Sequence, residues 1–145
     1  MTVIFCILSS VFVQGIIIID RTVEDVFEFI ADMKSQLSCW EMIHVPNLAE
    51  LEEGATETVG MYHLAGKQHT CDIELYITRP GSGVVTRLSW DSGELAAEWR
   101  IMESGGRTKI ELNVEGNGGG LATSVSLRQM APRILNRVKQ HFDMA

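Results

Sequence analysis

The chain has 145 residues and a formal net charge of −7, from 12 Lys and Arg against 19 Asp and Glu. This length suits one domain with one hydrophobic core, and 46% hydrophobic with 21% charged residues excludes a disordered or coiled-coil chain. The acidic balance argues against nucleic acid as a partner, because phosphate binding needs a basic surface. The three cysteines, Cys6, Cys39 and Cys71, follow no recognisable spacing, which favours a reducing compartment and a cytoplasmic protein.

The first segment, Met1–Ile19, has no charged side chain, and the first charge is the negative Asp20. A secretory signal would begin with a positive region instead, and polar or small residues interrupt the apolar run at Ser9, Ser10, Gln14 and Gly15. The density of Val, Ile and Phe therefore predicts a buried or partner-covered strand, without stable membrane insertion. A membrane-contacting anchor, a cleaved signal, and a contact that joins two chains in a homodimer are the alternatives.

The spacing of apolar residues changes from that of a strand to that of a helix after Asp20, where Thr22 and Asp25 form a variant capping box. Apolar residues at helical spacing follow and predict a short helix to about Met33: Val23, Val26, Phe27 and Ile30. A second short helix is expected over Ser35–Met42, with Leu37 and Trp40 facing inward and an end before Pro46.

From Val45 to Glu115 the sequence predicts about six strands, separated by glycine-containing turns. Alternation is clearest in the late strands, so we expect antiparallel strands with one apolar and one charged face. The expected inward residues are Ile73, Leu75, Ile77, Thr86, Leu88, Trp90, Leu95, Ala97, Trp99, Ile101, Thr108, Ile110, Leu112 and Val114.

A long amphipathic helix ends the chain, with its apolar stripe running from Leu127 to Phe142. Pro132 predicts either a kink near Arg128–Pro132 or a helix that starts afresh at Pro132. Gly116–Gly120 matches no phosphate-binding motif and is interpreted as a connector. The cations Arg128, Arg133, Arg137 and Lys139 are expected on the solvated face, and a basic strip for an acidic partner or a membrane surface is the alternative.

This order of elements, with the segments Ile19–Phe27 and Glu98–Ile101 before Gly105–Thr108, resembles the START-like helix-grip superfamily. The chain looks most like its polyketide cyclase/dehydrase and lipid-transport group, also called SRPBCC. The resemblance implies an α+β helix-grip fold: a curved antiparallel sheet of about seven strands around a long C-terminal helix, with two short helices between the first two strands. It also implies a single START-like domain over residues 1–145, with an unusual charge-free extension at residues 1–10.

A sheet wrapped around one helix leaves an apolar pocket suited to small apolar ligands. The residues expected to line it are Trp40, Leu75, Leu88, Trp90, Trp99, Ile101, Met130, Ile134 and Val138, although each also suits a closed core. The favoured function is therefore binding or transport of a hydrophobic molecule such as a lipid, an isoprenoid or an aromatic polyketide. The alternative is a cyclase or dehydratase that uses the same cavity.

For acid/base chemistry the sequence offers His44 and His69, because histidine titrates near neutrality. Glu74 and Tyr76 are less suitable because they alternate outward, and no catalytic triad or zinc-protease motif is present. His63, His69 and Cys71 could together offer metal ligands, but their spacing is not that of structural zinc sites. We therefore expect exposed hairpin histidines, no metal and no cofactor, with Cys71 as an unreactive strand residue.

Overall fold

A computed structural model describes residues 11–64, 67–118 and 124–144. The extension at residues 1–10, and with it the homodimer contact predicted there, lies outside the described residues. In chain order, the elements are β1 (Val11–Ile19), α2 (Val23–Ala31), α3 (Met33–Leu37), β2 (Ile43–His44), a 3-10 turn (Leu48–Glu50), β3 (Glu57–Leu64), β4 (Lys67–Arg79), β5 (Gly83–Trp90), β6 (Gly93–Ser104), β7 (Arg107–Gly118) and α4 (Ser124–Asp143).

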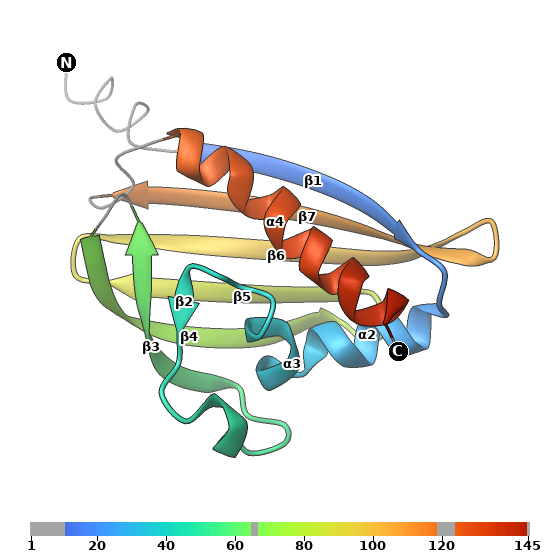
Figure 1. Cartoon of the computed structure of the whole chain (residues 1–145), viewed down its shortest axis with the longest axis horizontal. Helices are drawn as coiled ribbons and strands as arrows, with labels where there is room; N and C mark the ends of the chain where they lie inside the picture. The colour runs from blue at the N-terminus through green and yellow to red at the C-terminus, as the bar shows by residue number, and fades with distance from the viewer. Residues whose placement is uncertain (1–10, 65–66, 119–123, 145) are drawn as a thin grey trace.

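The strands form one seven-stranded antiparallel sheet in the order β1-β7-β6-β5-β4-β3-β2. The sheet curls, α4 crosses its concave side near β1 and β7, and α2 and α3 lie at one end of that side (Figure 1). The predicted α+β helix-grip architecture is confirmed, including the two short helices between the first two strands.

Hydrogen bonds from side chains fix both short helices. Thr22 caps α2 by accepting from the amide of Asp25 at 3.2 Å, as the capping pattern predicts. Buried Gln36 of α3 donates to the Ile30 carbonyl at 2.7 Å and accepts from the Thr86 hydroxyl of β5. These bonds hold α3 against the concave face of the sheet.

Gly15 allows the close approach of α4 to β1. A Cβ atom at this position would lie 2.8 Å from the Leu135 Cδ1 and 3.4 Å from the Ala131 Cβ. At the other end of the helix, Arg21 donates to the Phe142 carbonyl at 2.7 Å. The helix is thereby seated over β1, and the apolar stripe of its described part faces the core: Met130, Ala131, Ile134, Leu135, Val138 and Phe142.

Three expectations about local structure are wrong in detail, and one of the two alternatives given for Pro132 is excluded. The second helix is α3, Met33–Leu37, rather than Ser35–Met42, and the first strand expected after Val45 is replaced by β2 and a 3-10 turn. Pro46 lacks the amide that a strand needs, and Asn47 has a left-handed φ of 60°, so an extended chain stops there.

The other two differences concern the ends of the long elements. Helix α4 begins at Ser124 and runs through Pro132, so it does not start afresh at the proline. Pro132 cannot donate to the carbonyl of Arg128. Because Arg128 and Pro132 are both exposed, this carbonyl lies on the solvent side of the helix. Gly116 pairs with Val11 and Leu95 within the sheet, so the connector starts later than predicted, and residues 119–120 lie outside the described residues.

No helix among the described residues is long and apolar enough to cross a membrane.

Candidate functional site

The residues predicted to line a pocket all lie in the core between the concave face of the sheet and α4. Those on strands alternate inward in register, for example Leu75 opposite Thr86 and Leu88 opposite Leu95, and those on α4 are spaced four residues apart on one face. Trp99, Leu88, Ile134 and Val138 are fully buried, and Trp90 is 9% exposed. The structure therefore brings the set into one apolar interior that is closed around its central residues. Ile77, also predicted inward, is instead 54% exposed, next to the register shift of β4 between Ile77 and Arg79.

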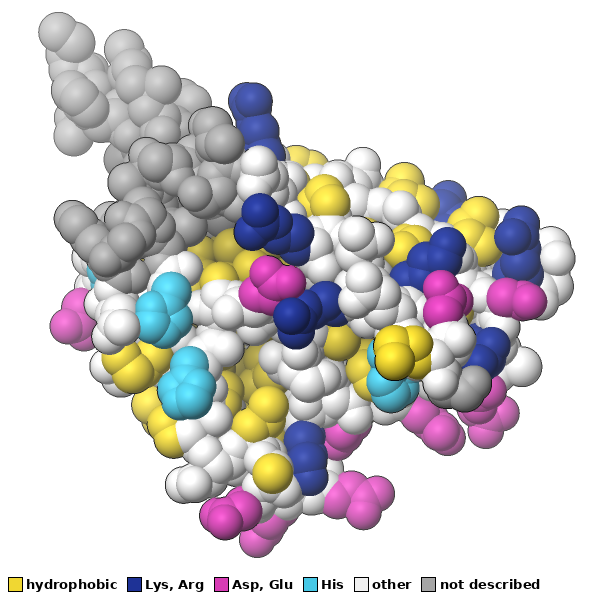
Figure 2. Space-filling view, viewed as in Figure 1, with side chains coloured by type: hydrophobic (Ala, Val, Ile, Leu, Met, Phe, Trp, Pro, Cys, Tyr) yellow, Lys and Arg dark blue, Asp and Glu magenta, His cyan; other side chains and the backbone are white. Residues whose placement is uncertain are grey.

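A groove of about 690 Å³ opens between the α3–β2 segment and α4. Its apolar lining comes from Leu37, Trp40, Ile43, Val45 and Leu48, and its rim from Ser38, Glu41, His44 and Arg137. Figure 2 shows hydrophobic side chains on this face of the molecule beside the basic side chains. The groove gives access to Trp40, a predicted ligand-binding residue.

An ion pair spans the rim of this groove. The Arg137 Nε of α4 lies 2.9 Å from a Glu41 carboxylate oxygen, and the Arg137 Nη1 donates to the Ser38 carbonyl at 3.5 Å. Both charged side chains are nearly half exposed, so the pair contributes little to stability. It does, however, tie α4 to the segment on the opposite side of the groove.

Several polar atoms of the interior are buried without a hydrogen-bond partner among the described residues: Trp40 Nε1, Tyr62 OH, His69 Nε2 and Trp99 Nε1. Buried polar side-chain atoms are usually paired, and an unpaired one costs about 1–3 kcal/mol. Indole N–H and phenol O–H groups are donors. The interior thus combines aromatic walls with unpaired donors, which is the composition of a site for an apolar molecule that carries oxygen atoms.

Burial also determines the protonation state of Cys71 and Tyr62 on the concave face of the sheet. Burial raises the pKa of the Cys71 thiol to about 11, and burial followed by the neighbouring Cys71 raises the pKa of Tyr62 above its usual range. Both groups are therefore neutral at physiological pH, and Tyr62 keeps the proton that it can donate.

The structure separates the predicted histidines. His69 lies on the concave face opposite Tyr62, whereas His63, opposite Gln68, faces outward. His44 is exposed, pairs with Met61 and lies at the rim of the groove. His63 therefore cannot join His69 and Cys71 around one metal ion, and no metal-binding group of His, Cys, Asp and Glu occurs in the described part of the chain.

Glu74 and Tyr76 face outward, as predicted. Tyr76 is 45% exposed and its hydroxyl donates to the Glu74 carboxylate. This bond, followed by burial, raises the pKa of Tyr76.

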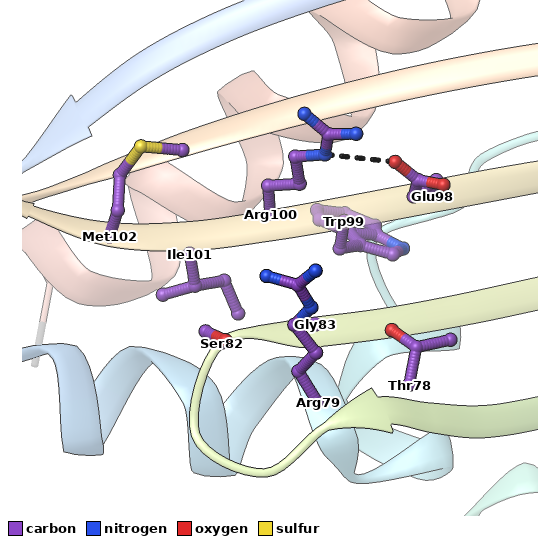
Figure 3. Close-up of a pocket in the computed structure, with 9 residues that line it drawn as sticks. All are labelled: Thr78, Arg79, Ser82, Gly83, Glu98, Trp99, Arg100, Ile101 and Met102. Carbon is purple, nitrogen blue, oxygen red and sulfur yellow. Dashed lines mark hydrogen bonds and ion pairs between the residues drawn. The ribbon is translucent and has the colours of Figure 1, made fainter.

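A second depression, of about 490 Å³, lies where β4, β5 and β6 meet at the turn after Arg79. In Figure 3 the side chains of Arg79 and Arg100 lie at its edge, with Arg100 paired to Glu98 at 2.9 Å. Trp99 contributes to its wall but is fully buried. The depression is thus a charged surface feature that does not expose the apolar interior.

Sequence reasoning missed Tyr62 and most of the lining of the groove. The inward positions of β3 include Gly60 and Tyr62, and the neighbouring Val59 and Met61 are apolar, so the strand shows no clear alternation. Only its pairing with β4 identifies Tyr62 as inward. Leu37 was predicted inward. Ile43, Val45 and Leu48 also line the groove, but they belong to the irregular segment after α3, where the sequence shows no periodic pattern.

Comparison with known proteins finds no matching family model and no match among curated proteins. Solved structures do match. A START superfamily protein from Mycobacterium smegmatis is 10% identical with a TM-score of 0.69, over 92% of this chain and 97% of that chain. The Zhui aromatase/cyclase from Streptomyces sp. R1128 is 18% identical with a TM-score of 0.64, over 92% and 94%. A major latex-like protein from Panax ginseng is 9% identical with a TM-score of 0.62, over 92% and 98%. These similarities and the topology together show that the chain has a START-like, or SRPBCC, helix-grip fold.

Proposed function

We propose that the chain binds a small hydrophobic molecule, of the class of lipids, isoprenoids or aromatic polyketides, between the concave sheet face and α4. The observation that carries the proposal is the set of unpaired donors in an aromatic interior, which includes Trp40 Nε1 beside the groove. A closed core without a ligand would have no reason to keep buried donors unpaired. The fold shared with an aromatase/cyclase and a latex-like protein supports the proposal.

Binding requires the groove to deepen, because Trp99 and Val138 are fully buried. The segment best placed to move is the one from α3 to β2. Helix α3 has 5 residues and β2 has 2, and β2 pairs only with β3. Such short elements with few backbone hydrogen bonds open at low cost. The Arg137–Glu41 pair and the 2.7 Å bond from Lys34 to the Ala49 carbonyl limit this movement.

The test is a screen of lipids and polycyclic aromatics by tryptophan emission and by native mass spectrometry. Leu48→Glu places a charge in the apolar lining of the groove and should weaken binding at least about tenfold, since a desolvated charge is strongly unfavourable there. Leu51→Glu is the matched control, because Leu51 is also partly buried but lies outside the groove lining. Emission that no apolar compound changes would overturn the proposal.

The second candidate is an enzyme of the cyclase or dehydratase type. His69 supports it, because its Nε2 is buried and the residue lies on the concave face opposite Tyr62 in the β3–β4 ladder, where a histidine can transfer protons. His44 is the weaker candidate, because it is exposed at the rim of the groove. Turnover of a poly-β-keto substrate that falls in His69→Ala but not in the outward, exposed control His63→Ala would establish this function; absence of turnover would exclude it for that substrate class.

A further inference from the structure

Three aromatic side chains meet on the concave face where β3 and β4 pair. Tyr62 is fully buried and lies directly opposite His69 in the antiparallel ladder. Trp90 of β5 stacks on Tyr62 with the ring centroids 5.2 Å apart, and its ring lies 5.8 Å from that of His69. Trp90 therefore contacts the ring of each partner, and the three rings form one cluster, the Tyr62–His69–Trp90 cluster.

Two polar atoms of this cluster, one on Tyr62 and one on His69, lack partners among the described residues. Both Tyr62 OH and His69 Nε2 are buried and unpaired, although the two residues are direct neighbours across the ladder. One such atom is a local irregularity, but two on neighbouring side chains mark a place where a hydrogen-bonding group fits. Because burial raises the pKa of Tyr62, the phenol keeps its proton and presents a donor.

The cluster neighbours two openings. On one side, Tyr62 pairs with Ile43, which lines the groove between α3 and α4. On the other side, His69 and Trp90 line a pocket of about 520 Å³ between the ends of β4 and β5. A molecule in the groove can thus direct one end toward Tyr62 and His69.

We infer that Tyr62 and His69 form a polar subsite that binds a neutral oxygen atom, a carbonyl or a hydroxyl, of an otherwise apolar ligand. Trp90 packs against a flat part of that ligand. A carboxylate is disfavoured, because the described lining of the neighbouring pocket contains Asp91 and no Lys or Arg, and Asp72 beside it is exposed on the outer face of β4. The inference rests on the proposed function and adds the chemical class of the ligand.

The experiment measures the affinity of the full chain for naphthalene, 2-acetylnaphthalene and 2-naphthoate by equilibrium dialysis. The wild type should bind 2-acetylnaphthalene about five- to tenfold more tightly than naphthalene, the effect of one neutral hydrogen bond. It should bind 2-naphthoate no more tightly than naphthalene. Tyr62→Phe keeps the ring and removes the hydroxyl, so it should abolish the preference and leave naphthalene binding within about twofold.

His69→Phe tests the second residue and keeps an aromatic ring beside Trp90. It should reduce the preference, whereas the outward, exposed His63 provides the control His63→Phe, which should keep it. Near-ultraviolet circular dichroism verifies that each variant is folded.

The outcomes separate the inference from the proposed function. If naphthalene binds and the wild type shows no preference for the ketone, or if the preference survives in both Tyr62→Phe and His69→Phe, the subsite is refuted while hydrophobic binding stands. Tightest binding of 2-naphthoate refutes the choice of a neutral oxygen. If none of the probes binds, the proposed function fails and the subsite fails with it.

Discussion

Tyr62→Phe should make the ligand-free protein more stable, although it weakens binding. The Tyr62 side chain is fully buried and its hydroxyl has no partner among the described residues. Removing this hydroxyl eliminates a desolvation cost of about 1–3 kcal/mol without creating a large cavity. We therefore expect the free energy of unfolding to rise by about 1–2 kcal/mol, which corresponds to roughly 3–6 °C in melting temperature for a chain of this size.

The matched control removes a buried hydroxyl that has a partner. Thr86 is also fully buried, and its hydroxyl donates to Gln36, so Thr86→Val leaves the Gln36 oxygen unpaired and should cost about 1–3 kcal/mol. Urea denaturation monitored by circular dichroism gives both values, and unchanged m-values show that the denatured states are comparable. If Tyr62→Phe lowers stability as much as Thr86→Val does, the Tyr62 hydroxyl is already satisfied and the reasoning is refuted.

Three further predictions concern packing, pH and the groove. Gly15→Val should lower the free energy of unfolding by about 1–3 kcal/mol in urea, because α4 leaves no space for a side chain; the exposed neighbour Gln14 supplies the control Gln14→Val, and equal losses would contradict this. The free energy of unfolding should fall from pH 9 to pH 11, because the pKa of the Cys71 thiol is near 9.0 in the unfolded chain and about 11 in the folded one. If Cys71→Ala loses as much stability over this pH range as the wild type does, this prediction is contradicted. Arg137→Ala removes the pair with Glu41 and should change stability by less than about 1 kcal/mol while it accelerates ligand exchange in stopped-flow fluorescence; an unchanged exchange rate would contradict this.

The parts of the fold that follow a period were predictable from the sequence. Alternation in β6 and β7 and the helical stripe of α4 identify the inward residues, because each position is decided by its neighbours two or four residues away. Trp99 and Ile134 are buried as those patterns predict. Ile77 continues the alternation in the sequence but is exposed, because it lies at the register shift of β4, and the alternation itself does not reveal such a shift.

The candidate site was predictable only in part, because it depends on irregular chain and on pairing between strands. Asn47 adopts a left-handed conformation, and the chain around it brings Val45 and Leu48 into the groove. The cluster of Tyr62 with His69 arises from the β3–β4 register, which fixes both side chains on the concave face. Histidine and tyrosine at these positions have the same local sequence signature whether they face water or the core.

The measurement that tests the account most directly is the nuclear magnetic resonance spectrum of the indole N–H groups during addition of 2-acetylnaphthalene. The chain has three tryptophans, and the indole nitrogens of Trp40 and Trp99 are buried without a hydrogen-bond partner in the described part of the chain. If the ligand enters the interior, the indole resonances of Trp40 and Trp99 should shift with saturation at one ligand per chain. Resonances that stay fixed while only exposed residues respond would contradict binding between the sheet and α4.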